Sequence, residues 1–398
     1  MAIGRVGGGG VGGKSTDAGS KWLKRERRDK GWMTSRSRSN QNIMQAGNKL
    51  GIFLFANVVK NLIANYLVGS NKLTMKAVCV GSGSEGLQNQ QVCDAILSLV
   101  PAEKVVMKSF TVVYIGTATY DLPGPKHNQT KLLEAAGGAI VPLCVTEKGA
   151  EQRDYDYMKA LITEQADIIV ISGGNTLFAM DVWRRIRLDE LLRVAKESNE
   201  TVLCGGSAGF ICWFTGGHSD SWDTETYKDY MLAEAAKADN DTNKDEASGA
   251  PKDESEKKNW RYLRVGCLGF LDGLACAHYD RIQSNGVLRA KDFDAMMLRH
   301  SGERGFGLDH WAAFVVNGEN YTILSVEGKP GSVLEDGSFS EDREGKPGMW
   351  VMNVNDQNEV ERSLVDFSGG KLSDLLKSDF TVKEDEGCES CRAENPSE

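Results

Sequence analysis

Residues 201–213 read TVLCGGSAGFICW, and this stretch decides how the chain around it folds. Its first part, 201–204, has the composition of a short buried strand, and an apolar run resumes after Gly209. Between them lies the pattern Gly205-x-Ser207-x-Gly209. A serine in a sharp turn from strand to helix needs small neighbours, and the turn raises its hydroxyl above the sheet. Because the helix start points backbone N–H groups at developing negative charge, Ser207 is the lead candidate for a nucleophile.

Apolar runs and helical spacing alternate along the chain that leads to this turn. We expect strands at 76–80, 110–115, 139–145, 167–171 and 201–204, and helices at 88–100, 128–136, 154–165 and 176–197. This alternation predicts an α/β fold with a mostly parallel sheet. The strand runs are continuously apolar, so helices should flank both faces of the sheet. Sites in such sheets lie beyond the carboxyl ends of the strands, where residues 81–83, 173–175 and Ser207 fall.

The sequence predicts one long ordered domain between two polar ends. A chain of 398 residues can bury a sizeable core, and we place the α/β domain at 73–368. Residues 233–259 are mostly small or charged, which predicts an acidic disordered insert. Further strand-like runs occur at 268–278 and 306–317. Short apolar runs with Gly turns from Tyr321 to Val354 predict a small antiparallel C-terminal extension, and 369–398 read as a polar tail.

The N-terminal extension, residues 1–72, is basic and is expected to be largely disordered, with an apolar helix near 50–68. That apolar segment fits a membrane anchor, a targeting segment or a helix packed on the body, so membrane contact stays open. We expect a cytoplasmic protein, or alternatively one targeted to an organelle or anchored through this extension. The run from Gly8 to Ser15 matches a phosphate-binding P-loop in letters only, because no buried strand precedes it and a charged stretch follows.

Charge and cysteine usage narrow the class of protein. Residues 1–50 hold eleven Lys or Arg and three Asp or Glu, so of the net charge of −9 the remainder carries −17. An acidic body argues against nucleic acid as the principal ligand. The nine cysteines are scattered through apolar runs, which indicates reduced thiols rather than a disulfide framework. Cys388 and Cys391 lack a second pair nearby and do not predict a metal site.

A serine hydroxyl needs a base, and the chain has five histidines. His278 ends the apolar run 274–277, from which a side chain can project into a cleft shared with Ser207. It is therefore the best candidate base. The acid that should orient its imidazole is not selected by the residues alone. The position of each in the chain leaves four candidates: Asp220, Asp223, Asp280 and Asp309.

Three motifs in order resemble the dipeptidase E and cyanophycinase group of serine peptidases. They are residues 173–176 (GGNT), 205–209 (GGSAG) and 277–279 (AHY). The resemblance covers roughly residues 75–320. It implies a fold similar to class I glutamine amidotransferases, with a flavodoxin-like sheet. It also implies a hydrolase that cleaves small peptides as an exopeptidase or dipeptidase.

The resemblance assigns a role to individual residues. It implies Ser207 as nucleophile, His278 as base and Asp220 as the acid, with Asp309 as the runner-up. The backbone N–H groups of Gly174 and Ala208 become the donors of the oxyanion hole. No cofactor or metal is implied, and the expected partner is a small peptide, with a homodimer as a further expectation.

The chain departs from the aspartyl dipeptidases of this group after the histidine. Their segment rich in Gly, His, Glu, Thr and Arg, associated with binding an N-terminal aspartate, is replaced here by residues 279–286 (YDRIQSNG). Arg281 could still hold a substrate carboxylate. Two alternative functions stay open: a binding-only member that keeps the fold, and an esterase or amidase with the same triad.

Overall fold

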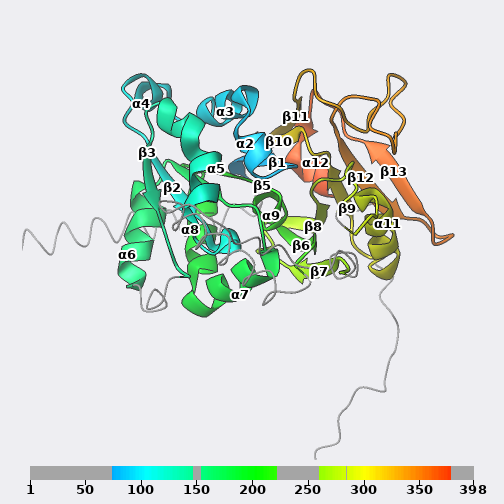
Figure 1. The fold of residues 1–398 in the computed structure, drawn as a ribbon, viewed down its shortest axis with the longest axis horizontal. Coiled ribbons are helices and arrows are strands. Elements are labelled where there is room, and N and C mark those ends of the chain that lie inside the picture. Colours follow the sequence, from blue (N-terminus) through cyan, green and yellow to red (C-terminus); the bar gives the residue numbers. More distant parts are fainter. Residues whose placement is uncertain (1–73, 147–153, 222–259, 284, 378–398) are drawn as a thin grey trace, which may run out of the picture. The chain divides into compact units, whose positions relative to one another are not determined.

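The fold is known from a computed structural model that describes residues 74–146, 154–221, 260–283 and 285–377 (Figure 1). All of them belong to the unit Lys72–Glu398. The extension 1–72 with its apolar segment 50–68, the P-loop-like run, the insert 233–259 and the pair Cys388 and Cys391 lie outside the described residues. So does Asp223. Within the described ranges, every helix is too short or too polar to span a bilayer.

The first half of the domain alternates strands and helices as expected. In chain order the elements are β1 (Met75–Val80), α2 (Ser84–Leu87), α3 (Gln90–Leu97), α4 (Ala102–Val106), β2 (Thr111–Ile115), the 3₁₀ turn η1 (Thr117–Thr119), α5 (Pro123–Ala135), β3 (Ala139–Pro142), α6 (Tyr155–Ala160), the π-helical turn η3 (Leu161–Gln165), β4 (Ile168–Ile171), α7 (Thr176–Ile186), α8 (Leu188–Ser198) and β5 (Val202–Gly206). The expected single helix at 176–197 is wrong in one respect. It breaks at Arg187, whose φ of 62° lies in the left-handed region, and continues as α8.

The second half adds short helices and nine strands, counted over the described residues. They are α9 (Ala208–Ile211), β6 (Phe214–Ser219), β7 (Leu263–Gly266), β8 (Leu271–Cys276), α11 (Arg289–Arg299), β9 (Gly305–Leu308), β10 (Ala312–Gly318), β11 (Asn320–Ser325), β12 (Met349–Val354), β13 (Val360–Leu364), β14 (Gly370–Lys371) and α12 (Leu372–Leu376). The described fold thus runs past the expected boundary at 368, because β14 pairs with β11 and α12 follows it.

The described strands form two sheets. The first has the order β14-β11-β10-β1-β5-β4-β2-β3, in which β1 to β5 are parallel and β10, β11 and β14 join antiparallel. The second has the order β13-β12-β9-β8-β6-β7, and only β6, β8 and β9 run parallel to one another. The expectation of a mostly parallel sheet therefore holds for β1 to β5 and is wrong for the fold as a whole, which is mixed.

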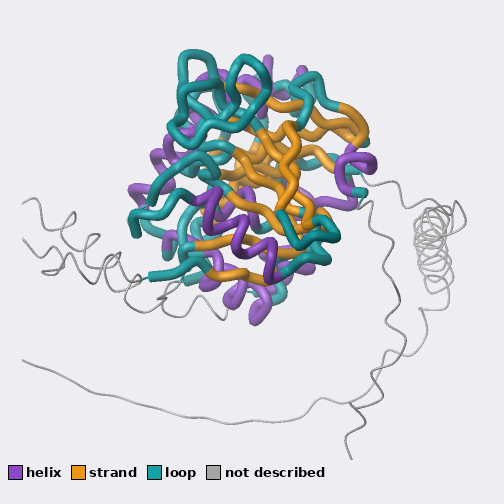
Figure 2. Tube along the Cα trace, turned by 90° about the vertical axis from the view of Figure 1, so that its right-hand side faces the viewer, coloured by secondary structure: helices purple, strands orange, loops and turns teal. Residues whose placement is uncertain are grey.

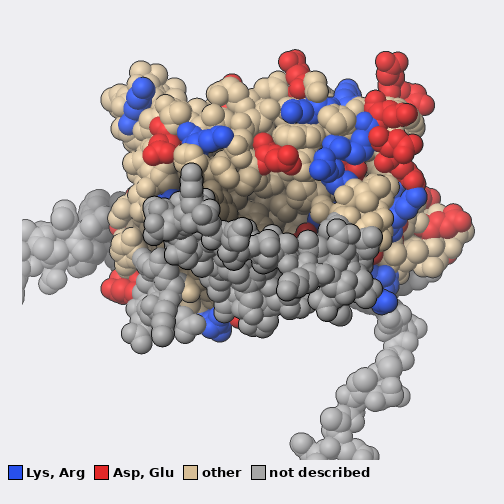
Figure 3. All heavy atoms as spheres, viewed as in Figure 1, with Lys and Arg blue, Asp and Glu red and all other residues tan. Residues whose placement is uncertain are grey.

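Helices cover both faces of the first sheet, as the apolar strands predict. On one face, side chains such as Val78 and Val112 pack with α3 and α5. On the other, Cys79 and Ile169 pack with α7 and α8, and this core continues onto the second sheet. In Figure 2 the strands lie in the interior, with helices and loops around them. The far face of the second sheet packs against α11. Charged side chains of both signs are spread over the described surface seen in Figure 3.

Candidate active site

The turn at Ser207 has the strained geometry that its sequence predicts. Ser207 has φ 57° and ψ −112°, a region that a residue with a side chain seldom adopts, and it lies between β5 and α9. Small neighbours are required here. A Cβ on Gly209 would come within 2.3 Å of the Ile171 carbonyl oxygen, and one on Gly205 within 2.9 Å of the Gly209 Cα. Ser207 is partly exposed, whereas the residues on either side of it are buried.

Three loops meet beside this serine, each at the carboxyl end of a parallel strand. A Cβ built on Gly173, which follows β4, would lie 3.4 Å from the Ser207 Cβ and 3.3 Å from the Cα of Gly83. Gly83 follows β1. The expected convergence of residues 81–83, 173–175 and Ser207 at one edge is therefore present.

The two expected oxyanion donors lie on this edge. Ala208 is the first residue of α9, a position whose N–H has no partner within a helix. Gly174 has φ 124°, and a Cβ there would meet the Ala118 carbonyl oxygen at 2.4 Å, so only glycine fits. The next residue, Asn175, donates its own N–H to that carbonyl at 2.8 Å and caps α7 through its side chain. Among the described residues, no backbone carbonyl accepts a hydrogen bond from the Gly174 N–H.

His278 lies at the same strand end as Ser207. The Ser207 N–H donates to the Val80 carbonyl at 3.2 Å, and the His278 N–H donates to the next carbonyl, that of Gly81, at 3.0 Å. Consecutive Cα atoms are about 3.8 Å apart, so one short segment holds both backbones. His278 also has positive φ, 50°. The described hydrogen bonds do not join its ring to Ser207 Oγ, and such bonds often form only when substrate is bound.

The ring of His278 contacts a second histidine instead of a carboxylate. Its Nδ1 lies 2.7 Å from Nδ1 of His310, and Nε2 of His310 lies 2.6 Å from Oε2 of Glu85. Burial lowers the pKa of His278 well below its usual value, and the positive charge of Arg289 adds to the effect. Burial also lowers the pKa of His310, while Glu85 opposes the shift. Both rings are therefore neutral near neutral pH.

The two candidate acids have other partners among the described residues. Asp220 is 39% exposed, and its Oδ2 lies 3.6 Å from Nη1 of Arg289. Asp309 is buried, and its Oδ2 accepts hydrogen bonds from the backbone N–H groups of Ser332 and Gly348. Burial raises the pKa of Asp309 to about 8, and the neighbouring Asp280 adds to this shift. The described hydrogen bonds link neither carboxylate to His278.

Asp280 also has a structural setting. It is buried, its Oδ1 accepts from the His310 backbone N–H at 2.7 Å, and its Oδ2 pairs with Nε of Arg343 at 2.6 Å. Together with the Asp309 contacts, this fixes residues 330–348 against the turn that carries His310. The carboxylates of Asp280 and Asp309 thus hold the backbone near the two histidines in place.

The remaining histidines lie in other settings. His218 is fully buried in β6 with Nε2 2.9 Å from Oδ1 of Asp292 and its ring stacked on Tyr262. Its pKa falls to about 4 because of burial, against the opposing hydrogen bond to Asp292. His127 lies in α5, and His300 follows α11 with Nδ1 3.5 Å from Oε1 of Glu303.

A buried arginine lies next to these groups, and sequence reasoning missed it. Arg289 begins α11 and is 1% exposed; one of its Nη atoms donates to the His218 carbonyl at 3.0 Å. Its Nε has no hydrogen-bond acceptor among the described residues. Buried guanidinium groups are almost always paired, so this free donor is unusual. Arg281, the arginine that the sequence suggested, is partly exposed and shifts the pKa of His278 downwards as Arg289 does.

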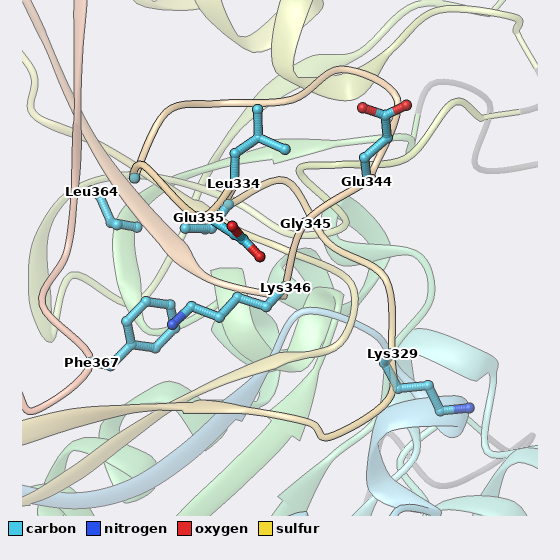
Figure 4. A pocket seen from close by; sticks show the side chains of 10 residues that line it. Lys329, Leu334, Glu335, Glu344, Gly345, Lys346, Leu364 and Phe367 are labelled. Carbon is cyan, nitrogen blue, oxygen red and sulfur yellow. The ribbon is translucent and has the colours of Figure 1, made fainter.

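A cavity of about 910 Å³ lies elsewhere on the described structure (Figure 4). Its walls come from residues 329–346 and from Leu364 and Phe367, and the ammonium group of Lys346 lies 4.1 Å from the centre of the Phe367 ring. None of the expected site residues lines it. The candidate residues Ser207 and His278 lie instead at the strand ends.

Comparisons with known proteins show what the chain is similar to. A model of peptidase family S51 matches residues 80–324. A protein of Trypanosoma brucei brucei described as G2/mitotic-specific cyclin-1 is 29% identical over 281 residues, which are 67% of this chain and 80% of that protein. The uncharacterized peptidase YgaJ of Bacillus subtilis (strain 168) is 44% identical over 57 residues, 14% of this chain and 24% of its own length.

Among solved structures, a peptidase from an acI-B1 Actinobacterium is similar with a TM-score of 0.41 and 14% identity, over 64% of this chain and 88% of that one. The family match spans more than half of the chain and includes the turn at Ser207, both glycine loops and His278. The chain belongs to peptidase family S51, a family of serine peptidases.

Proposed function

We propose that the protein hydrolyses small peptides as a dipeptidase-like exopeptidase, with Ser207 as nucleophile and His278 as base. One observation carries this proposal: the strained turn at Ser207 meets two glycine loops, and one short segment after β1 holds the backbones of both Ser207 and His278. A structural serine needs neither the strain nor the glycines around it. The arrangement suits acyl transfer.

The chemistry follows from the positions of these groups. Ser207 Oγ attacks the scissile carbonyl while Nε2 of His278 accepts its proton. The carbonyl oxygen becomes an oxyanion, which the N–H groups of Gly174 and Ala208 stabilise. Each such donor contributes on the order of 3 kcal/mol to the transition state. His278 then gives its proton to the leaving amine, and water releases the acyl group by the same steps in reverse.

The third member of the expected triad, Asp220, remains a proposal from the family resemblance. It lies six residues after Phe214, at the end of the strand that follows the elbow helix. Its oxygen is placed 3.6 Å from Arg289. Asp220 could therefore serve through Arg289, by holding that buried cation beside His278.

Arg289 also supports a substrate class. Its unpaired Nε and the nearby charge of Arg281 give the site a positive potential around His278. A guanidinium binds carboxylates with fixed geometry. We therefore propose peptides that place a carboxylate close to the scissile bond, as every dipeptide does at its C-terminus.

A cleavage screen tests the function. Dipeptides with varied first residues are incubated with the full chain, and released amino acids are measured. We expect turnover of at least some of them, and Ser207→Ala should lower it by at least about 1,000-fold. Ser98→Ala, which changes an exposed serine at the end of α3, is the matched control and should keep full activity. Full activity of Ser207→Ala would show that another group performs the chemistry.

The same site could act on esters or other amides, since the acyl-transfer steps are shared. A panel of p-nitrophenyl esters run beside the dipeptides distinguishes these substrates. Peptides should be cleaved with the higher kcat/KM if the positive potential around His278 selects a carboxylate.

A further inference from the structure

We propose that His310, backed by Glu85, is the positioning residue that sets the tautomer of His278, a task that a carboxylate performs in most serine hydrolases. This inference deepens the proposed function and rests on His278 acting as the base. It concerns three residues that the sequence spreads over more than two hundred positions. Nothing in the motifs around Ser207 points to it.

The geometry brings these residues together from three separate elements. Glu85 lies in α2, just after β1; His278 follows β8; and His310 lies in the turn between β9 and β10. The two links measure 2.7 Å, between the Nδ1 atoms of the histidines, and 2.6 Å, between His310 Nε2 and Glu85 Oε2. Both are within hydrogen-bond range. These two hydrogen bonds connect the exposed Glu85 through His310 to His278, the candidate base.

The middle ring is held firmly. His310 is 3% exposed, its backbone N–H donates to the buried Asp280, and its ring packs edge-on against Trp311. Glu85, by contrast, is 60% exposed and anchors the outer end. A rigid, buried imidazole that bonds an exposed carboxylate at one end can transmit the preference of that carboxylate to His278 at the other.

The hydrogen bonds then determine which ring nitrogen of His310 and of His278 carries the proton. A carboxylate can only accept, so Nε2 of His310 must carry the proton that it shares with Glu85. In a neutral His310, Nδ1 then carries no proton and accepts a hydrogen bond. The bond between the two Nδ1 atoms needs one donor, which must be His278 Nδ1–H. Nε2 of His278 is therefore unprotonated, the form that a general base for Ser207 requires.

Burial and the nearby arginines favour the neutral form of both rings, and only the carboxylates of Asp280 and Glu85 act in the other direction, on His310. Arg281 and Arg289 face His278, and Arg281, Asp280 and Glu85 face His310. If both rings were protonated, the two Nδ1–H groups would oppose each other at 2.7 Å. The chain of hydrogen bonds therefore works in the pH range where His278 is needed as a base.

The first test reads the tautomer directly in the full-length protein. With ¹⁵N-labelled histidine, the ring nitrogens of His278 are assigned by their loss in His278→Gln. We expect protonated Nδ1 and bare Nε2 in the wild type, and a shift toward protonated Nε2 in His310→Phe. Protonated Nε2 in the wild type, or no change in His310→Phe, would overturn the proposal. This reading requires no substrate, so it decides the role of His310 even if no peptide is cleaved.

The second test uses catalysis and a conservative rescue. His310→Phe removes the acceptor and should lower kcat by about 100-fold with KM nearly unchanged, because the base keeps the wrong tautomer. His310→Gln offers an amide oxygen to His278 and should recover activity to within about tenfold of the wild type. Glu85→Leu should fall between them. Thermal unfolding of each variant checks that the fold is kept.

Asp220→Asn is the comparison that separates the two accounts. If Asp220→Asn lowers kcat by about 100-fold while His310→Phe stays within about twofold of the wild type, Asp220 orients the base and the proposal is wrong. The reverse pattern supports it. If Ser207 does not react, the proposed function is wrong, but the measured tautomer of His278 still tests the role of His310.

Discussion

At the scale of single residues, the proposed chemistry depends on a serine held with φ 57° by glycines that cannot be replaced. Gly209→Ala places a Cβ 2.3 Å from the Ile171 carbonyl oxygen, which forces the turn to move. We expect the free energy of unfolding to fall by about 2 kcal/mol and activity to fall at least about tenfold. Urea unfolding and the dipeptide assay measure the two effects.

Gly124→Ala is the matched control for that substitution. Gly124 lies in the first turn of α5, and a Cβ there meets nothing within 4 Å. Alanine is the better helix former, so stability should stay the same or rise slightly. Equal losses in both variants would show that the packing of the elbow has no special role.

The residues of the site were predictable to different degrees. Ser207, Gly174 and Ala208 lie in short motifs at the ends of the neighbouring strands β4 and β5. The motif alone was enough to propose Ser207, and the family resemblance added Gly174 and Ala208. Glu85 and His310 could not be found this way, because their contact depends on how β10 joins the first sheet. The one available signal was their place: each lies within five residues of a strand end. Nothing in the sequence indicated Arg289, because its burial depends on contacts with residues 218–220.

At the scale of elements, the turn between β9 and β10 organises the site. The apolar run 306–317 reads as one strand, yet it divides between the two sheets, because Asp309 binds the backbone of Ser332 and Gly348 and turns the chain. Asp309→Ala should release this segment and lower the free energy of unfolding by about 3 kcal/mol, since it leaves buried N–H groups unpaired. Urea unfolding at about pH 7 measures the loss.

Asp336→Ala serves as the control at the exposed tip of the same segment, where the carboxylate bonds only Ser338. We expect it to cost less than about 1 kcal/mol. If Asp309→Ala cost no more than this, Asp309 would not hold the segment in place.

Element boundaries were harder to predict than element types. The parallel strands β1 to β5 were expected from their apolar runs, and each was found within a few residues. Strand β6 was not expected, because its glycines at 216 and 217 have low strand propensity and its burial comes only from pairing with β7 and β8. No glycine or proline lies beside Arg187 to indicate that the helix breaks there.

At the scale of the whole molecule, buried histidines should make the fold sensitive to acid. The folded pKa of His218 is about 4, below the usual 6.5. As the pH falls from about 6.5 to about 4, the unfolded chain takes up a proton that the folded chain refuses, so stability falls. The loss from His218 alone should approach roughly 3 kcal/mol. The lowered pKa values of His278 and His310 act in the same direction.

Urea unfolding at about pH 7 and about pH 5 checks this expectation. His218→Gln should lower stability at both values but reduce the difference between them. Ser98→Ala, which changes an exposed side chain that does not titrate, should leave the difference unchanged. A wild-type protein equally stable at both values would contradict the assigned burial of these rings.

The two-sheet architecture as a whole was only partly visible in the sequence. The alternation of apolar runs and helical spacing predicts β1 to β5. The second sheet is built from short strands, and the pairing of these strands depends on residues far apart in the sequence. Its role is clear from the site. It carries His278 after β8 and His310 in the turn after β9, so in the proposed mechanism the first sheet supplies the nucleophile and the second sheet supplies the base.

The most direct test of the central claim is covalent labelling of Ser207. The full chain is treated with a fluorophosphonate probe, digested, and mapped by mass spectrometry. We expect one adduct, on the peptide containing Ser207, that is absent in Ser207→Ala and retained in Ser98→Ala. An adduct on a different residue, or undiminished labelling of Ser207→Ala, would contradict this claim.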